Sequence, residues 1–200
     1  MDVAFLVDSS GSISFRNFRK VKNFVVELAS KFDISPGGSR AAVVVYSTRA
    51  TTRIRFTDHS TYGSFANAVQ SLRHERGYTR IDLALEKAYF DVFGPRGKSR
   101  FLVPKIAFVL TDGEQTDAED KRSLEAVSDR LKKKAGVRII SIGIGKRVHK
   151  NQLTVIASSE KDVVIAESFD GLVSEVEPLF QSACKGNEGW FILELVLLTL

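Results

Sequence analysis

The chain has 200 residues, of which 44% are hydrophobic and 26% are charged, and its formal net charge is +5. This composition supports one domain with an ordinary apolar core and leaves no room for a second domain of similar size. So small a positive charge does not point to nucleic acid, and a solvated basic surface accounts for it. We therefore predict a single domain that does not bind nucleic acid.

The first predicted elements are a buried strand and an amphipathic helix. Residues 3–7 are all apolar, which is typical of a strand in a parallel sheet that helices cover on both faces. In residues 15–32, apolar side chains recur at intervals of three and four, as one face of a helix requires. The other face of this helix carries Arg16, Arg19, Lys20 and Lys22. These cations form either a solvated face or a surface for sulfated glycans and acidic partners.

The rest of the chain continues this alternation. Further strands are predicted at residues 40–46, 51–56, 106–110, 137–145 and 162–166, and further helices at residues 62–72, 80–93, 148–157 and 169–182, with another that ends near residue 134. Apolar and polar residues alternate at 51–56, as in an edge strand with one wet side. The pattern predicts an α/β fold, a doubly wound, mostly parallel six-stranded sheet with helices on both faces.

Oxygen-bearing side chains follow two of these strands. Asp8, Ser10 and Ser12 come directly after the first strand, and their spacing of two allows them to converge on a loop over the strand end. Asp112 follows the strand at 106–110 in a Thr-Asp-Gly turn, and Thr79 lies just before the helix at 80–93. In open α/β sheets, ligands bind in the crevice beyond the carboxyl ends of the strands. We therefore expect these side chains to meet there.

Two carboxylates and three hydroxyls form a set of hard oxygen ligands. Such a set suits Mg²⁺, Mn²⁺ or Ca²⁺ and suits zinc or copper poorly, and water can complete an octahedron around Mg²⁺. The first motif alone has a second interpretation, in which Ser12 or Ser14 caps the following helix. The second strand end favours the metal site. The predicted ligands are Asp8, Ser10, Ser12, Thr79 and Asp112, with Mg²⁺ preferred over Mn²⁺ and Ca²⁺.

These residues resemble the metal-ion-dependent adhesion site (MIDAS) of the von Willebrand factor type A (VWA) domain, which is written Asp-x-Ser-x-Ser, a distant Thr and a distant Asp. The motifs DSSGSIS, GYTRIDLALEKA, VLTDGEQTD and IISIGIG occur in the family's order. The resemblance covers about residues 2–184 and implies a Rossmann-like fold whose strand at 51–56 is antiparallel. Within the family, the chain looks most like the modules of matrix and secreted adhesive proteins such as matrilins, collagen VI and cochlin.

The resemblance implies a function in adhesion. The bound ion keeps a coordination position open, and a Glu or Asp carboxylate of an extracellular protein fills it. Collagen, another matrix protein, a cell-surface receptor and a second copy of the chain all offer such a carboxylate. The resemblance also implies a secreted, extracellular location and an affinity that can be linked to movement of the last helix.

Two other classes of function remain open to test. In the first, the chain is a structural or assembly module that binds through its basic surfaces while the ion serves only stability. In the second it is an enzyme, which we do not expect, because phosphoryl transfer at a strand-end Asp needs an acid/base partner and a nearby Lys or Arg. No nucleotide cofactor is predicted either. The Gly-Lys-Ser at residues 97–99 lacks the earlier Gly of a phosphate loop, and Gly143-x-Gly145 lacks the third Gly of the dinucleotide motif.

Four acidic residues are expected at the start of a helix, where the helix dipole favours negative charge. They are Glu114, Asp117, Glu119 and Asp120. The three histidines, His59, His74 and His149, are scattered and are interpreted as surface or loop residues without a zinc site.

The ends of the chain differ from the pattern of a complete secreted protein. Met1 leads directly into the first strand without a signal peptide, so we expect a fragment of a longer protein. The domain is assigned to residues 1–184, and residues 185–200 form an apolar tail that is too short to cross a membrane, interpreted as a truncated segment, an artefact or an apolar flap. Cys184 is the only cysteine. The family often pairs this position with a cysteine before the first strand, which is missing here.

Overall fold

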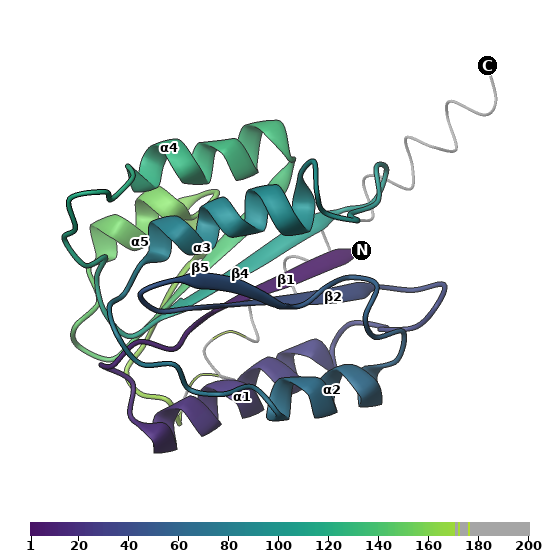
Figure 1. Ribbon diagram of the computed structural model, residues 1–200, viewed down its shortest axis with the longest axis horizontal. Helices are drawn as coiled ribbons and strands as arrows, with labels where there is room; N and C mark the ends of the chain where they lie inside the picture. The colour runs from purple at the N-terminus through teal and green to yellow at the C-terminus, as the bar shows by residue number, and fades with distance from the viewer. Residues whose placement is uncertain (171, 173–175, 177–200) are drawn as a thin grey trace.

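A six-stranded sheet forms the centre of the molecule in the computed structural model, which describes residues 1–170, 172 and 176 (Figure 1). The strand order is β3-β2-β1-β4-β5-β6, and only the pairing of β2 with β3, at one edge, is antiparallel. The strands are β1 (Asp2–Asp8), β2 (Arg40–Tyr46), β3 (Ala50–Ile54), β4 (Lys105–Thr111), β5 (Val137–Ile144) and β6 (Val163–Ala166). The predicted α/β class and its edge strand are confirmed.

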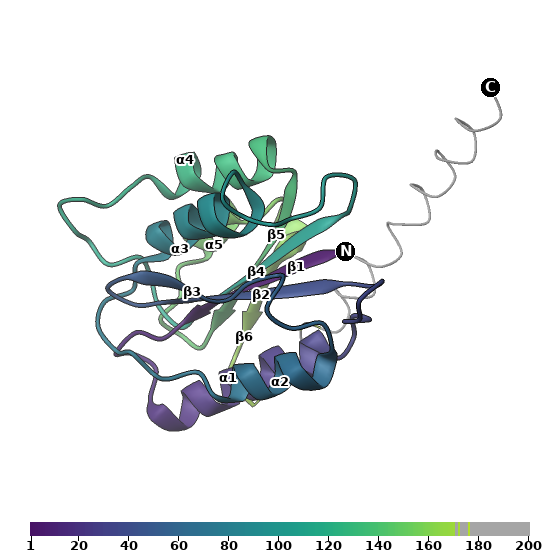
Figure 2. The same ribbon diagram turned by 45° about the vertical axis from the view of Figure 1, so that its right-hand side comes forward.

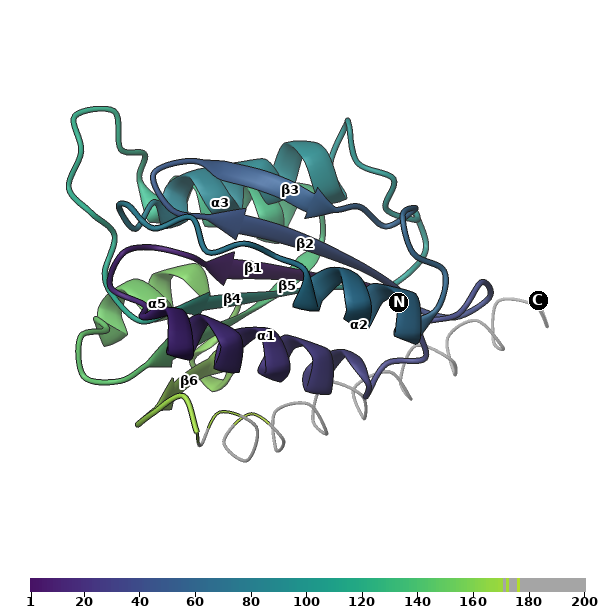
Figure 3. The ribbon, with the colours of Figure 1, turned by 60° about the horizontal axis from the view of Figure 1, so that its bottom comes forward.

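Helices cover both faces of the sheet (Figures 1 and 2). One face carries α1 (Phe15–Ala29) and α2 (Tyr62–Gln70), which lie side by side in Figure 3. The other face carries α3 (Ile81–Ala88), α4 (Leu124–Asp129) and α5 (Lys150–Ile156). Two π-helical turns, η1 (Tyr89–Phe93) and η2 (Arg130–Lys134), extend α3 and α4, and a short 3-10 helix, η3 (Glu160–Asp162), precedes β6.

The core is divided into two layers by the sheet. Alternate side chains of β1 point to opposite faces, so Phe5 packs on the side of α1 and α2, while Leu6 packs on the side of α3. The ring of Phe5 stacks on that of Phe108 from β4, with centroids 5.5 Å apart. Both layers are apolar, which explains why β1 reads as a continuous hydrophobic run.

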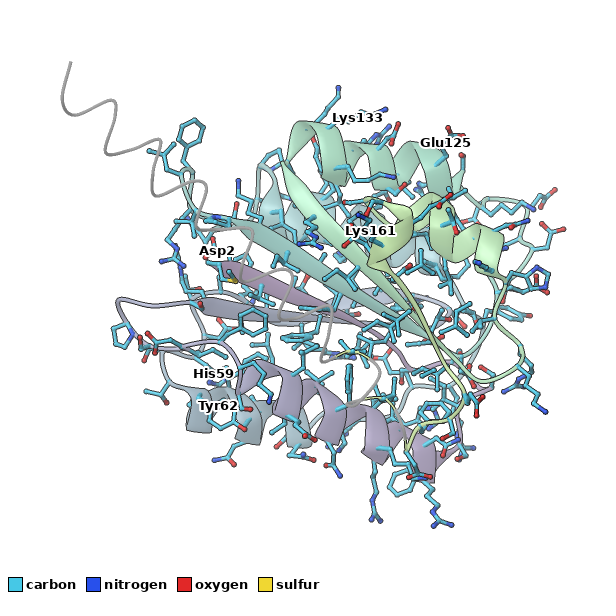
Figure 4. All side chains as sticks on the ribbon, turned by 180° about the vertical axis from the view of Figure 1, so that it is seen from behind. Asp2, His59, Tyr62, Glu125, Lys133 and Lys161 are labelled. Carbon is cyan, nitrogen blue, oxygen red and sulfur yellow. The ribbon has the colours of Figure 1, made fainter. Side chains whose placement is uncertain are left out.

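The sheet changes its winding direction at β1. This strand pairs in parallel with both β2 and β4, and the chain leaves β1 for the α1 face but leaves β4 for the α4 face. The carboxyl ends of β1 and β4 are therefore neighbours at a topological switch point, with Val7 paired to Leu110. Figure 4 shows Asp2, at the opposite end of β1, well away from this edge.

Some predicted details differ from the structure. Phe15 begins α1 but is 63% exposed, so the buried face of the helix starts at Phe18. Glu114, Asp117, Glu119 and Asp120 are not at a helix start: they lie in the loop of residues 112–123, and α4 begins after its N-cap Ser123. Their charges meet side chains there, as in the Asp117–Lys121 and Asp120–Arg80 ion pairs.

The carboxyl-terminal predictions are tested only in part. Leu172 and Val176, expected on the inner face of the closing helix, are buried in the core layer next to α1. The rest of the helix predicted at 169–182, Cys184 and the tail at 185–200 lie outside the described residues, apart from residues 169 and 170. Within the described part of the chain, no helix has both the length and the apolar character of a membrane span.

Candidate metal centre

Asp8 is the more enclosed of the two predicted carboxylate ligands. It ends β1, is 1% exposed, and accepts hydrogen bonds from the Ser10 backbone N–H at 2.8 Å and the Thr111 hydroxyl at 2.9 Å. Burial raises the pKa of its carboxyl to about 6, although these hydrogen bonds oppose the shift. Among the described residues, no Lys, Arg or His forms an ion pair with Asp8. A buried carboxylate without a cationic partner is a favourable place for a metal ion.

Ser10 and Ser12 connect Asp8 to the second strand end. The two hydroxyl oxygens are 2.8 Å apart, and the Ser12 hydroxyl donates to Asp112 Oδ1 at 2.5 Å. Asp112 is 4% exposed and directly follows β4. The capping interpretation holds for Ser14 alone, whose Oγ accepts from the Asn17 N–H as the N-cap of α1. Ser12 instead faces the neighbouring strand end.

Thr79 joins the group from the loop before α3. It is 7% exposed, its N–H donates to Thr116 Oγ1 at 2.9 Å, and its carbonyl accepts from the Thr116 N–H at 2.9 Å. A Cβ placed on Gly113, the neighbour of Asp112, would lie 4.0 Å from the Thr79 hydroxyl oxygen. The structure thus brings all five predicted residues to one edge of the sheet.

A glycine turn holds the Thr79 loop against the Ser10 loop. The Gly77 carbonyl accepts from the Gly11 N–H at 2.8 Å. Gly77 has a φ of +103°, and a Cβ there would lie 2.3 Å from Thr48 Oγ1. Only glycine meets both requirements without strain.

An ion-pair network fixes the start of α3 next to Thr79. Arg80 donates two hydrogen bonds to Asp82, which is fully buried, and a third to Asp120. Burial raises the pKa of Asp82, but the hydrogen bonds from Arg80, the Arg122 N–H and Gln115 outweigh it and hold the pKa at about 2. Since Gln115 belongs to the loop that follows Asp112, this network links that loop to the start of α3, next to Thr79.

Two residues near the centre were missed by sequence reasoning. Arg147, in the loop between β5 and α5, donates to Asp112 Oδ2 at 3.0 Å and to the Ser12 carbonyl at 3.1 Å. His74 is half-buried: its ring stacks on Phe18 and its Nε2 is 3.1 Å from the Ser10 carbonyl. Both are remote from their partners in the sequence, so no local pattern signals them.

The chemistry of the donors fits a hard divalent cation. Two carboxylates and three hydroxyls supply only oxygen, which suits Mg²⁺, Mn²⁺ and Ca²⁺. No part of residues 1–170, 172 and 176 gathers three or more His, Cys, Asp or Glu side chains able to hold a metal, and at this edge two carboxylates are joined by hydroxyls instead. The oxygen donors at the edge of β1 and β4 are therefore the candidate ligands, and metal binding there stays a prediction.

Comparison with known proteins places this geometry in a family. The model of the von Willebrand factor type A domain matches residues 2–177. Curated relatives include matrilin-2 of Mus musculus, 28% identical over 94% of this chain and 20% of that protein, and human cochlin, 30% identical over 92% of this chain and 32% of that protein. The chain spans about a fifth to a third of the length of these relatives. They are secreted, non-enzymatic proteins of the extracellular matrix.

Solved structures agree with this assignment. Proximal thread matrix protein 1 from the mussel byssus has a TM-score of 0.82 and 34% identity, covering 92% of this chain and 46% of that one. Another structure of the same protein, also with a TM-score of 0.82, is described as having a zinc-occupied MIDAS motif and is covered to 45%. A site of this type can therefore accept zinc, beyond the hard cations predicted here. The family match, the sheet order and the converging strand ends together show that this chain belongs to the von Willebrand factor type A domain family.

Proposed function

We propose that this domain binds a protein partner through a divalent metal ion at the edge formed by β1 and β4. The observation that carries the proposal is the hydrogen-bonded series that joins Asp8, Ser10, Ser12 and Asp112 across two strand ends. The negative charge of Asp112 adds to the burial that disfavours ionised Asp8, so a cation held between the two carboxylates would relieve their repulsion. The ligands would be Asp8, Ser10, Ser12, Thr79 and Asp112.

The bound ion would supply an open coordination position for a carboxylate oxygen of the partner. The chain's own residues prepare that position. Asp8 is held by the Ser10 N–H and the Thr111 hydroxyl, so it is oriented before any ion arrives. Ser10 and Ser12 contribute neutral oxygens, which leaves more positive charge on the ion than an all-carboxylate set would. Mg²⁺ is the expected ion, with Mn²⁺, Ca²⁺ and zinc as competitors.

The partner would be an extracellular protein that presents a Glu or Asp side chain. Matrix proteins such as matrilin-2, cochlin and the collagen α1(XII) chain of Notophthalmus viridescens, which is 31% identical over 94% of this chain, support an extracellular setting. Two exposed aromatic side chains lie next to the hydrogen bond between Gly11 and Gly77 in the sequence: Phe15, 63% exposed, begins α1 after the first loop, and Tyr78, 62% exposed, follows Gly77 in the second. They offer apolar contact area around the carboxylate. Self-association through the same centre is a further possibility to test.

We infer that the domain is not an enzyme. Asp8 would be the nucleophile in phosphoryl transfer, but it is 1% exposed and both of its oxygens accept hydrogen bonds. In-line attack would require Asp8 to leave both hydrogen bonds and reach a phosphorus atom, whereas a metal ligand at this position has only to contact a small ion.

The test is calorimetric titration of Mg²⁺ and Mn²⁺ into the chelator-treated full chain and its Asp112→Asn variant. We expect about one ion per chain in the unchanged protein and none in the variant, because removing one of two carboxylates removes half of the site's charge. Binding to immobilised fibrillar collagen and to immobilised copies of the chain is then measured with and without chelator.

Asp117→Asn is the matched control. Asp117 lies in the same loop, is exposed, and pairs only with Lys121 among the described residues, so its loss changes the charge equally without touching the centre. Absence of ion binding at millimolar metal would contradict the proposal. If the ion binds but partner binding survives both chelator and Asp112→Asn, the domain is instead a structural module that uses its basic surfaces.

A further inference from the structure

Arg147 lies against the centre although its loop supplies none of the five ligands. Its guanidinium donates from one nitrogen to both Asp112 Oδ2, at 3.0 Å, and the Ser12 carbonyl, at 3.1 Å. These acceptors come from two different loops, and both belong to predicted ligand residues. The Arg147 side chain is still 66% exposed, so it can leave without disturbing the core.

The segment that carries Arg147 contacts the Asp112 loop at two further points. His149 Nε2 is 3.2 Å from Glu114 Oε2, and the Gln115 N–H donates to Gln152 Oε1 at 2.9 Å. These contacts continue to hold the two segments together when Arg147 moves. The guanidinium can therefore exchange its partners while its backbone stays in place.

Both oxygens of Asp112 are already in use. Oδ1 accepts from the Ser12 hydroxyl and Oδ2 accepts from Arg147. A divalent cation that takes Asp112 as a ligand must share this carboxylate with the guanidinium or displace it. A cation on the same carboxylate withdraws negative charge from the metal and repels it, so either route weakens ion binding.

We propose that Arg147 sets the ion affinity of this centre by competing with the divalent ion for Asp112. The inference rests on the proposed metal site and adds a residue to it that is not a ligand. Linkage makes the effect reciprocal: Arg147 weakens ion binding, and a bound ion weakens the contact of Arg147 with Asp112 by the same factor. A bound ion thus frees a cation at the rim of the centre, where a partner's carboxylate arrives.

The test compares Mg²⁺ and Mn²⁺ affinity in the full chain, Arg147→Gln and Arg147→Lys. We expect Arg147→Gln to bind the ion about tenfold more tightly, a moderate factor because solvent screens a side chain this exposed. Arg147→Lys should fall between the unchanged chain and Arg147→Gln, since an ammonium keeps the charge but is more strongly hydrated and sits on a shorter side chain. Thermal unfolding provides a second readout: the rise in melting temperature on adding Mg²⁺ should be larger in Arg147→Gln than in the unchanged chain.

Lys146→Gln is the matched control. Lys146 is exposed in the same loop, and no hydrogen bond or ion pair is found for it among the described residues, so the variant loses the same charge without losing a contact to Asp112. If Arg147→Gln binds the ion no more tightly than Lys146→Gln does, the inference about Arg147 is wrong, but the proposed metal site is not contradicted. If neither the unchanged chain nor Arg147→Gln binds an ion at millimolar metal, the metal site itself is wrong and the inference falls with it. Tight binding by Arg147→Gln alone supports the competition.

Discussion

Stability of the ion-free fold favours a protonated Asp8, whereas ion binding requires the ionised carboxylate. The carboxylate must be ionised to bind a cation, yet it is 1% exposed and burial disfavours its charge. The raised pKa of about 6 expresses that conflict. Because the folded pKa lies above the unfolded value of 3.8, the stability linked to protonated Asp8 is complete below pH 3.8 and is lost as the pH rises to about 6. At neutral pH without an ion, Asp8 destabilises the fold.

We therefore predict that Asp8→Asn stabilises the ion-free chain and abolishes ion binding. The amide keeps the geometry: its oxygen accepts the Ser10 N–H, its NH₂ donates to Thr111 Oγ1, and the Thr111 hydroxyl donates to the Gly113 carbonyl, as it already can. The free energy of unfolding should rise by up to about 3 kcal/mol near pH 8 in chelator, the equivalent of the pKa shift. Urea unfolding measures the gain in the free energy of unfolding, and calorimetry measures the loss of ion binding. A destabilised variant in chelator would contradict this account.

The convergence of the five candidate ligands could be predicted from the sequence because each one follows a strand or precedes a helix, whereas their binding of an ion stays a prediction. Asp8, Ser10 and Ser12 share one loop, and Asp112 repeats the strand-end pattern. Arg147 could not be predicted, since a surface arginine has many acceptors within reach and only loop geometry selects Asp112. The same limit applies to His74, whose place beside Ser10 depends on a contact between residues 64 positions apart.

At the scale of elements, His74 connects the loop after β1 to helix α1. Its ring lies 4.9 Å from the ring of Phe18 in α1, and its Nε2–H donates to the Ser10 carbonyl in the tautomer that this contact requires. Its Nδ1 is buried without a partner among the described residues. An unpaired buried nitrogen destabilises the fold, so this histidine is retained at some cost in stability. Holding the Ser10 carbonyl in place is the role that its contacts support.

His74→Phe should separate packing from positioning. The phenyl ring keeps the stack on Phe18 but removes both the hydrogen bond to Ser10 and the unpaired nitrogen, so the free energy of unfolding should change by no more than about 1 kcal/mol. Ion affinity should fall several-fold, because the loop from Asp8 to Ser12 loses the hydrogen bond that holds the Ser10 carbonyl. Urea unfolding and Mg²⁺ titration give the two quantities. Unchanged ion affinity would reduce His74 to a packing residue.

Element types followed from periodicity, whereas element ends followed only where polar residues bound an apolar run. The bounds predicted for the strand at residues 40–46 match those of β2, because an apolar run between polar breaks leaves one choice of bounds. The helix predicted at 80–93 is instead α3 followed by the π-helical η1, since a change from i+4 to i+5 hydrogen bonding leaves the apolar pattern almost intact. The acidic residues before α4 were misplaced because their charges are satisfied by side chains, not by the helix dipole.

Over the whole molecule, two buried carboxylates give stability opposite dependences on pH. Asp82 has a folded pKa of about 2, below its unfolded value of 3.8, so the stability that it contributes is present above pH 3.8 and is lost as the pH falls toward 2. Asp8 behaves in the reverse sense and loses its contribution between pH 3.8 and about 6. One carboxylate is paired with Arg80 and supports the scaffold, whereas the other is unpaired and supports the site.

We predict that the ion-free domain loses stability in both directions from about pH 4. The loss from Asp82 is about 2 kcal/mol toward pH 2, and that from Asp8 is about 3 kcal/mol toward pH 7, each from its pKa shift. Saturating Mg²⁺ should remove the loss of stability above pH 4, because the ion supplies the positive charge that ionised Asp8 lacks. It should leave the loss of stability toward pH 2 unchanged, since protons displace the ion there. Urea unfolding across this pH range, with Mg²⁺ and with chelator, measures the loss of stability toward pH 2 and toward pH 7. Asp8→Asn should remove the loss toward pH 7 without any metal. A decline toward pH 7 that persists in Asp8→Asn would assign it to other groups.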